Sequence, residues 1–326
     1  MRIKITLVAA ITICCLYSLQ SCKKSDPAPA PPPLPVIKPD TLTAGWTKQV
    51  VAVGSNMSDI FFNTSTNGYA CADNGVFKTT DGGTNWVQLN LTNNQWNNCF
   101  VTADGKASLV TYASNNIFRT IDGGSSFTNP ALGSVPLDIF FTDNNNGFSI
   151  AVDGLYKSVD AGVSWQRITT TGLSSSSNYA SLSFINNTTG WVVSQAGIFR
   201  SLGSLTSWQA SFANGGASSN YASVYAVSAT VIYVGDFSGQ IFKSTDGGAN
   251  FNFIKKLEDA SFTDIHFLTD QIGYASSGRS IYKTADGGSN WSKVVSLGEN
   301  FISEIHFTDA THGWACANKG VVLTFK

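Results

Sequence analysis

The chain has 326 residues, of which 43% are hydrophobic and only 13% are charged, and its formal net charge is −1. This length can bury a large core as one domain, and a near-neutral surface without a basic cluster excludes nucleic acid as the expected partner. Gly, Ser, Thr and Asn are abundant, which is typical of many short strands joined by turns.

Residues 1–21 are predicted to be a secretory signal. Arg2 and Lys4 form a basic head, and the mostly apolar run that follows is too short and too interrupted to be a secure membrane span. The segment leads into LQSC, which resembles the lipobox of bacterial lipoproteins and implies that Cys22 is lipidated. An ordinary signal with a chance Cys is the alternative. Lys23 rather than Asp follows, so the resemblance implies an outer-membrane lipoprotein that faces the periplasm or the cell surface.

Residues 22–40 are predicted to be a tether between the lipid and the folded domain. The stretch PAPAPPPLPVIKP at 27–39 holds most of the nine prolines of the chain. Proline fixes φ and removes a donor, so this segment should be an extended, semi-rigid spacer. Removal of the signal takes away two basic residues and no acid, which changes the formal charge to −3.

One motif, TTDGGTNW at 79–86, recurs along the chain and predicts a repeat architecture. Further copies begin at residues 120, 158, 244 and 284, and a degenerate copy, SLGSLTSW, occupies 201–208. Measured at the Asp position, the steps are 41, 38, 43, 43 and 40 residues. A period of this size indicates one supersecondary unit copied around an array. The 287 residues from Asp40 to Lys326 fit seven units of 41.

Each unit is predicted to hold four antiparallel strands. The second strand carries an aromatic followed by small residues, as in GYACA at 68–72, and the third is short and alternating, as in VFKT at 76–79. The fourth strand starts at the aromatic of the Asp motif. The first strand has a polar–apolar–x–apolar pattern, which occurs seven times and begins at Asp59, Asn98, Asp138, Ser181, Ser223, Asp264 and Glu304.

The two ends of the repeat region are predicted to complete one sheet. The seventh unit stops at VVLTFK (321–326), where an Asp motif would begin, and a segment like the missing fourth strand, GWTKQVV, occupies 45–51. Pairing these segments joins the first and last sheets and leaves no open edge. The sequence therefore predicts an all-β fold over residues 41–326, a closed seven-bladed β-propeller of four-stranded antiparallel blades.

The Asp of each motif is predicted to have a structural role. Its carboxylate can accept hydrogen bonds from backbone N–H groups just ahead of it, and the glycines supply the backbone angles of the turn. Cys71, Cys99 and Cys316 are expected to be buried free thiols. The carboxylates predicted to lie in these rim turns are Asp81, Asp122, Asp160, Asp246 and Asp286.

The GW or GY strands and the T-x-D-G-G-x-x-W turns resemble those of the BNR, or Asp-box, propellers over about residues 45–326. They are most similar to the photosystem II stability/assembly factor family and its non-photosynthetic bacterial relatives. The turn motif is specific for the fold but not for function, because sialidases, xyloglucanases, sortilin-like receptors and assembly factors share it. The resemblance implies a protein-handling or ligand-binding propeller. The sequence has neither the arginine cluster of the sialidases nor the basic patch of the assembly factors.

First strands line the channel of a propeller, and the loops that lead into them form one face. In each unit, the residue two positions before the polar residue that begins the first-strand pattern is mostly aromatic or apolar. Asn178 and Asn220 stand one position further back. This pattern predicts a shallow recognition site for a glycan or an extended peptide around a mildly acidic mouth. The alternative is that the aromatics fill gaps between blades and the polar ring binds water. The candidate ligand-binding residues are Trp96, Asn178, Tyr179, Asn220, Tyr221, Phe262, Asp264 and Glu304.

Two histidines, His266 and His306, share the third position of the sixth and seventh first strands. Together with the nearby acids they could hold a divalent metal, or they could be channel-wall residues hydrogen-bonded to neighbours or water. No Ser-His-Asp context, phosphate loop or Cys-His pair stands out. Glycoside hydrolysis would need paired carboxylates in a cleft, for which four acids are available: Asp59, Asp138, Asp264 and Glu304.

These patterns favour a non-catalytic binding or assembly scaffold at the bacterial envelope, monomeric and without a cofactor or bound metal. The expected partner is an envelope protein or a polysaccharide, and membrane contact is expected through the lipid anchor only. A glycan-cleaving hydrolase of the Asp-box propeller type is the alternative function.

Overall fold

The computed structural model describes residues 38–326 except for 92–94, 174–177, 215–219 and 260. The predicted signal, Cys22 and most of the tether lie outside the described residues. The described chain consists almost entirely of strands and turns, and it contains no helix long and apolar enough to cross a bilayer. Residues 37–326 form one compact unit.

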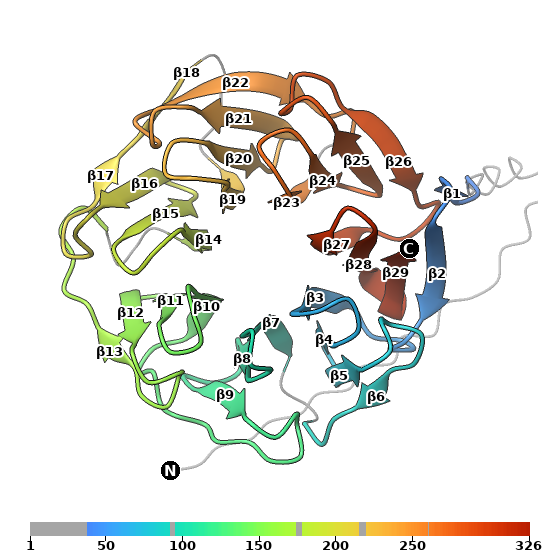
Figure 1. Ribbon diagram of the computed structural model, residues 1–326, viewed down its shortest axis with the longest axis horizontal. Helices are drawn as coiled ribbons and strands as arrows, with labels where there is room; N and C mark the ends of the chain where they lie inside the picture. Colours follow the sequence, from blue (N-terminus) through green and yellow to red (C-terminus); the bar gives the residue numbers. More distant parts are fainter. Residues whose placement is uncertain (1–37, 92–94, 174–177, 215–219, 260) are drawn as a thin grey trace, which may run out of the picture. The chain divides into compact units, whose positions relative to one another are not determined.

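Seven β-sheets are arranged in a ring around a central channel, as the sequence predicts (Figure 1). The first strand of each sheet lies innermost: β3 (Met57–Phe62), β7 (Trp96–Val101), β10 (Pro136–Phe141), β14 (Tyr179–Phe184), β19 (Tyr221–Ala226), β23 (Phe262–Phe267) and β27 (Ile302–Asp309). The second strands are β4 (Gly68–Ala72), β8 (Ala107–Thr111), β11 (Gly147–Ala151), β15 (Thr189–Ser194), β20 (Ile232–Asp236), β24 (Gly273–Ser277) and β28 (His312–Ala317). The third strands are β5 (Gly75–Thr79), β9 (Ile117–Thr120), β12 (Gly154–Ser158), β16 (Gly197–Leu202), β21 (Gln240–Ser244), β25 (Ser280–Thr284) and β29 (Val321–Phe325).

Outer strands complete most of the blades. They are β6 (Val87–Gln88), β13 (Gln166–Arg167), β17 (Gln209–Ala210), β22 (Asn250–Lys256), β26 (Ser292–Ser296) and β2 (Trp46–Val50). Two short strands extend the sheets further, β1 (Thr41–Leu42) along β26 and β18 (Phe212–Asn214) parallel to β22, and a 3-10 turn, η1 (Asn318–Gly320), precedes β29. In the second blade the place of the fourth strand is taken by isolated bridges, such as Arg119 with Thr128. Pro130 lies in this segment, and proline lacks the N–H that a continuous ladder needs.

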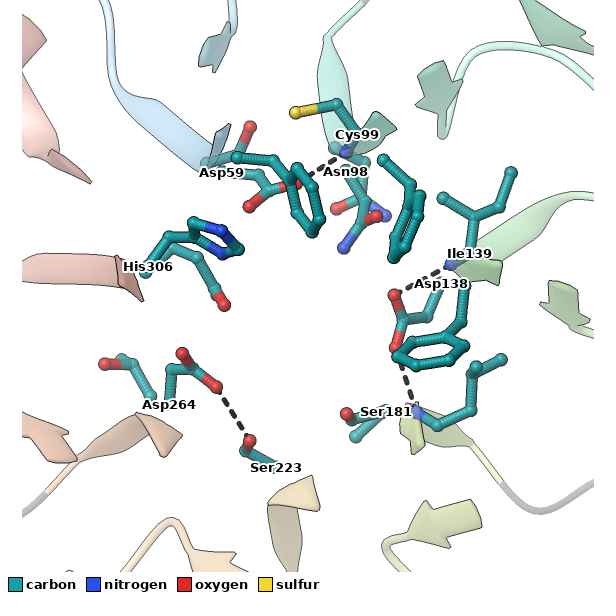
Figure 2. Close-up of a pocket in the computed structure, with 18 of the residues that line it drawn as sticks. Asp59, Asn98, Cys99, Asp138, Ile139, Ser181, Ser223, Asp264 and His306 are labelled. Atoms are coloured by element: carbon teal, nitrogen blue, oxygen red, sulfur yellow. Dashed lines mark hydrogen bonds between the residues drawn. The ribbon is translucent and has the colours of Figure 1, made fainter. Parts of the chain in front are cut away.

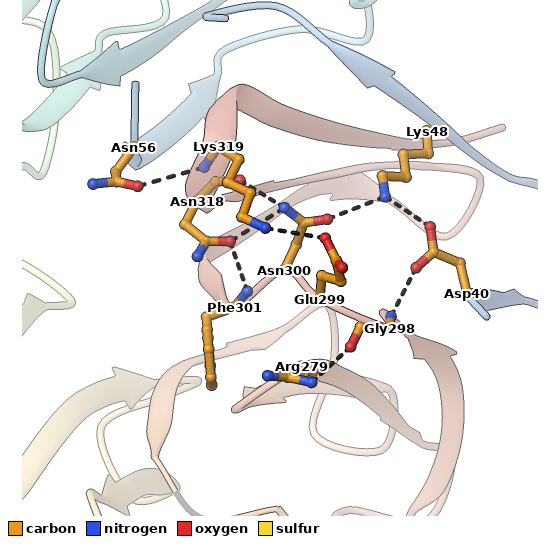
Figure 3. Close-up of polar contacts among 10 residues, drawn as sticks. All are labelled: Asp40, Lys48, Asn56, Arg279, Gly298, Glu299, Asn300, Phe301, Asn318 and Lys319. Atoms are coloured by element: carbon orange, nitrogen blue, oxygen red, sulfur yellow. Dashed lines mark hydrogen bonds and ion pairs between the residues drawn. The ribbon is translucent and has the colours of Figure 1, made fainter. Parts of the chain in front are cut away.

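The ring closes by pairing β2 with β29, which confirms the predicted closure. The register runs antiparallel from Trp46 opposite Phe325 to Val50 opposite Val321. Polar contacts of Lys48 also hold β2 in place (Figure 3). Lys48 Nζ lies 2.7 Å from Asp40 Oδ2 and donates a hydrogen bond to Asn300 Oδ1 at 3.1 Å. The last sheet is therefore built from segments at the two ends of the repeat region.

Aromatic stacking holds neighbouring blades together. The last residue of β3, Phe62, stacks on Trp314 of the preceding blade with 3.6 Å between ring centroids. Phe62 also lies over Gly68, its cross-strand partner, where a Cβ would stand only 2.5 Å from the ring. This close approach explains the glycine before the second-strand aromatic. Equivalent stacks join Phe184 with Phe148 (4.0 Å), Phe267 with Tyr233 (3.8 Å) and Phe307 with Tyr274 (3.8 Å).

Three of the second-strand aromatics also hydrogen-bond to the Asp turn of the next blade. Their polar atoms donate to glycine carbonyl groups: Trp314 to Gly82 (3.1 Å), Trp191 to Gly247 (3.2 Å) and Tyr233 to Gly287 (2.9 Å). Within the first turn, Asp81 Oδ1 accepts from the Asn85 N–H at 2.9 Å. This bond and the Asn85 side chain lower the pKa of Asp81 to about 2. The same backbone contact, four residues ahead, occurs at Asp122, Asp160, Asp246 and Asp286.

Replacing Tyr233 with Phe removes one donor to the next turn and leaves the ring stack in place. The free energy of unfolding is expected to fall by about 1 kcal/mol, the usual net contribution of a hydrogen bond. Tyr274→Phe is the matched control, because the buried Tyr274 hydroxyl has no hydrogen-bond partner among the described residues. Urea unfolding of the purified chain measures both variants. Equal destabilisation of the two would contradict the role given to the turn contact.

Candidate functional site

The seven first strands surround a pocket of about 400 Å³ in the channel. In β3 the register with β4 shifts by one residue between Met57 and Asp59. This β-bulge inserts one extra residue, so that two consecutive side chains, Ser58 and Asp59, line the channel. The same shift occurs in all seven first strands. The bulge therefore gives six of the seven blades an additional side chain on the pocket wall, since the corresponding residue of the seventh blade, Ser303, does not line the pocket.

The channel wall has three layers, and each layer comes from one position of the first strands. The layer nearest the channel mouth comprises Ser58, Asn97, Leu137, Ala180, Ala222 and Thr263. The next, which we call the polar layer, comprises Asp59, Asn98, Asp138, Ser181, Ser223, Asp264 and Glu304. The third comprises Phe61, Phe100, Phe140, Ser183, Tyr225, His266 and His306.

Carboxylates of the polar layer join neighbouring blades (Figure 2). Asp59 accepts from its neighbour Ile60 N at 2.6 Å and from Cys99 N of the next blade at 2.5 Å. Asp138 likewise accepts from Ile139 N at 2.8 Å and, in the next blade, from Leu182 N at 2.9 Å. Between the fifth and sixth blades, a serine hydroxyl donates to a carboxylate instead: Ser223 Oγ to Asp264 Oδ1 at 2.9 Å. These acids therefore stabilise the hub as well as lining the channel.

Burial raises the pKa of all four channel carboxyl groups. The pKa of Asp59 and that of Asp138 are each raised to about 7, although the backbone N–H groups that they accept act in the opposite direction. Burial also raises the pKa of Asp264, and it raises the pKa of Glu304 well above its usual range, where the charge of Asp264 adds to the effect. The channel therefore carries less negative charge near neutral pH than four ionised acids would.

Six side chains of the third layer form an aromatic collar. Their ring contacts run from Phe140 to Phe100 (5.4 Å), Phe61 (4.5 Å), His306 (4.2 Å), His266 (5.2 Å) and Tyr225 (4.9 Å). Burial lowers the pKa of His306 to about 4 and that of His266 well below its usual value, so both rings are neutral at pH 7. His306 Nε2 lies 2.8 Å from the carbonyl oxygen of Phe62, which can only accept, so Nε2 carries the proton and Nδ1 is an acceptor.

The aromatic residues selected from the sequence are not exposed at the mouth. The side chains of Trp96, Tyr179, Tyr221 and Phe262 are buried in clusters between the blades. Phe262, for example, lies over Gly235, where a Cβ would be 1.9 Å from its ring. These four residues are packing residues, which was the alternative interpretation of the pattern.

The polar residues selected from the sequence lie where a ligand could reach them. Asn178 and Asn220 are exposed in the loops before β14 and β19, and Asn178 Nδ2 donates to Gln195 Oε1 at 3.0 Å. Asp264 and Glu304 belong to the polar layer of the channel. The structure thus brings the two acids together and leaves the two amides on the surrounding loops.

Sequence reasoning missed the aromatic surface of the channel. Four residues of the collar were not selected: Phe61, Phe100, Phe140 and Tyr225. The sequence did contain a signal for them. The third position of the first-strand pattern, written x above, is aromatic in six of the seven copies when histidine is counted. Tyr112, in the turn between β8 and β9, was also missed, although it lines the pocket and is 56% exposed.

The chemistry of the pocket suits binding. Within the described ranges, no group of three His, Cys, Asp or Glu is placed to hold a metal ion. Asp59 and Asp138 are held by backbone N–H groups, and a hydrogen bond that links Asp264 and Glu304 contributes to their pKa shifts. The three cysteines of the described chain, Cys71, Cys99 and Cys316, are buried free thiols, as predicted.

No protein-family model and no curated protein matches the chain. Solved structures do match. YCF48 from Cyanidioschyzon merolae has 19% sequence identity and a TM-score of 0.70, covering 86% of this chain and 98% of its own. A structure of YCF48 bound to D1 peptide has 18% identity and a TM-score of 0.70 (88% and 98% covered), and a streptogramin B lyase has 11% and 0.73 (86% and 97%). At these identities the similarity shows the β-propeller fold alone.

The free energy of unfolding is expected to depend on pH through the channel acids. The pKa of Asp138 is about 7 in the folded state against an ordinary value of 3.8, so the folded state binds more protons than the unfolded state between these values. This contribution is present at about pH 4 and is lost as the pH rises towards 7. Asp138→Asn removes this contribution. The fall in the free energy of unfolding between about pH 4 and 7 is then expected to be smaller by on the order of 1–2 kcal/mol, a modest amount because Asp138 is only half-buried.

Asp81→Asn is the matched control for this pH dependence. Because the folded pKa of Asp81 is lowered to about 2, its contribution is lost only as the pH falls below about 4. Urea unfolding between about pH 2.5 and 8 should show the two variants changing opposite ends of the profile. An unchanged decline between pH 4 and 7 in Asp138→Asn would contradict the assignment. The ionisable groups that face Asp138 stay in place in both variants: Asp59, Asp264, Glu304 and Tyr112.

Proposed function

We propose that the chain is a non-catalytic binding scaffold that recognises an extended peptide segment of a protein partner. The peptide lies on the face where the channel mouth opens, across the loops that lead into the first strands. One observation carries this proposal: exposed apolar side chains and exposed amides lie at the end of the blades where the pocket opens, and the pocket itself is lined by polar and aromatic groups. Pockets of this composition bind ligands by apolar contact area and orient them by a few polar groups.

Four exposed apolar residues contribute to the mouth face. Tyr112, Val152 and Phe237 lie in the turns between second and third strands, and Phe301 immediately precedes β27. These turns and the starts of the first strands are at the same end of each blade, because successive strands run antiparallel. Arg279 lies over the Phe301 ring at 4.7 Å and donates to Gly298 O at 2.6 Å, which orders this part of the face (Figure 3).

The structure of YCF48 bound to D1 peptide supports a peptide as the ligand, because that protein has the same fold and its ligand is a peptide. The similarity alone carries no site residues to this chain. A protein partner rather than a glycan is favoured by the exposed apolar side chains on the mouth face.

The alternative of a glycan-cleaving hydrolase has little support from the site. The four arginines of the folded part are each bound outside the channel: Arg119 to Ala161 O, Arg167 to Asp153, Arg200 to Gly247 O and Arg279 to Gly298 O. None of them lines the pocket, so the described residues offer no arginine grip for an acidic sugar. The channel acids are engaged with the hub or with each other, as described above.

We further propose that the scaffold works at the bacterial envelope as an outer-membrane lipoprotein, attached through Cys22 and the proline-rich tether. This rests on the sequence of residues 1–40 and on the likeness of the repeat to the photosystem II stability/assembly factor family and its non-photosynthetic relatives. The lipid anchors the chain, and the tether provides a spacer between the membrane surface and the folded domain.

An array of random 12-residue peptides, printed beside a glycan array, tests the proposal with fluorescently labelled full-length chain. Peptide binding is expected, and the double variant Tyr112→Ala, Phe237→Ala should weaken it about tenfold or more through lost contact area. The matched control, Val159→Ala with Val163→Ala, removes equally exposed apolar side chains from an Asp turn at the opposite end of a blade. It should bind as the unmodified chain does.

Three results would overturn the proposal. One is binding confined to glycans, and another is the absence of binding to any peptide. The third is equal loss of peptide binding in the mouth variant and in the control, which would show that the mouth face has no special role.

A further inference from the structure

Negative charge in the channel has no basic counterpart. The polar layer holds four acids, and none of the described residues that line the pocket is a lysine or an arginine. The two histidines of the collar are neutral at pH 7, because burial lowers their pKa. Buried acids without a cationic partner are costly unless they are protonated or find a counter-charge. The free protein satisfies this requirement by holding protons on these groups.

A buried acceptor in the same layer also lacks a donor. Asn98 Oδ1 is buried and has no hydrogen-bond partner among the residues that the structure describes. Figure 2 shows the Asn98 side chain between those of Asp59 and Asp138 on the channel wall. An unsatisfied buried acceptor costs about 1–3 kcal/mol, and a bound N–H donor would remove that cost. A ligand that carries both a positive charge and an N–H donor would match these acids and this acceptor.

The aromatic collar supplies the surface that such a cation prefers. The ring centroids of Phe61 and Phe100 are 4.5 Å apart. In their own strands these residues stand two positions after Asp59 and Asn98, and all four line the pocket. The face of an aromatic ring attracts a cation, and it also packs against an aliphatic stem. Acceptors in one layer and aromatic faces in the next together match a charged head on a hydrocarbon chain.

We propose that the channel binds the guanidinium or ammonium group of an arginine or lysine side chain, inserted from a peptide that lies across the mouth. The inference rests on the proposed function for the source of that side chain. The N–H donors of the cation face Asn98 Oδ1 and the carboxylates of Asp59 and Asp138, and its stem packs against the collar. The pocket of about 400 Å³ is at the small end of ligand sites, which suits one side chain.

Binding of the cation is coupled to release of protons. The pKa of Asp59 and that of Asp138 are about 7, so each group is partly protonated at neutral pH. A cation favours the carboxylate form and lowers these pKa values, and the displaced protons pass to the buffer. Affinity should therefore rise between about pH 5 and pH 8. The ionisable groups that face the channel are Asp59, Asp138, Asp264, Glu304, His266 and His306, with Tyr112 and Tyr225.

Isothermal titration calorimetry with Nα-acetyl-arginine methylamide tests the inference on the full-length chain. Binding is expected, with a heat that varies with the ionisation enthalpy of the buffer because protons are released at pH 7. The citrulline counterpart has nearly the same shape without the charge, and should bind at least tenfold more weakly. Equal binding of the two compounds, no binding of the arginine compound, or binding without proton release would overturn the inference.

Two substitutions at one position place the cation in the channel. Asn98→Leu removes the acceptor and should weaken binding tenfold or more, whereas Asn98→Asp adds a carboxylate and should strengthen it. Glu258→Gln is the control, because Glu258 is an acid outside the channel with an 81% exposed side chain. If Asn98→Leu does not fold, the direction of the Asn98→Asp effect still decides. Unchanged affinity in Asn98→Asp would contradict the assignment.

Two further comparisons separate this inference from the proposed function and from a free diamine as ligand. Peptides on the array whose Arg and Lys are replaced by citrulline and norleucine should lose binding. Persistent binding that still depends on Tyr112 would overturn the cation site and leave the proposed function standing.

Binding of the arginine compound to a chain that binds no peptide would overturn the proposed function instead. Binding of 1,4-diaminobutane but not of the arginine compound would overturn insertion of a side chain.

Discussion

The contact between a second-strand aromatic and the next blade is the interaction on which the ring depends. Trp314 stacks on Phe62 of the adjacent sheet and also donates a hydrogen bond to Gly82 in the Asp turn of that sheet. The two most regular motifs of the sequence are therefore the two sides of one interface. The Asp holds the turn so that its glycine carbonyl faces the neighbouring ring, and the glycine beneath Phe62 gives that ring room. Repetition of this interface sets the blades around the channel, and the channel is the candidate site.

The period, the number of blades and the closing strand could be predicted from the sequence, because each follows from copies of one pattern. The composition of the channel wall could be predicted only in part, because the polar layer was placed there but the burial of Trp96 was not foreseen. Strict alternation makes every second residue of a strand face one way, but the bulge after the first residue adds a side chain and moves the earlier residues out of the wall. Trp96 is therefore buried between blades, while Asn98 and Phe100 reach the channel. A bulge leaves no residue signature in one sequence, so only coordinates place it.

The carboxylates of the polar layer combine two roles that are usually separate. Asp59 and Asp138 each join an inner strand to the next blade through a backbone N–H, and both also face the pocket. A change in their ionisation therefore affects the hydrogen bonds between neighbouring blades as well as the charge of the pocket. The fold alone does not convey this coupling, because YCF48 and a streptogramin B lyase share the propeller at only 19% and 11% sequence identity.

The pairing of β2 with β29 has a consequence for biosynthesis. Thr47 and Thr324, partners in that ladder, are separated by 277 positions along the chain. A ribosome or a secretion channel delivers the N-terminal partner first, so β2 has no partner strand until almost the whole polypeptide has emerged. Closure of the ring must therefore follow synthesis of nearly the whole chain, and until then the charge of Lys48 in the unpaired segment opposes pairing with other chains.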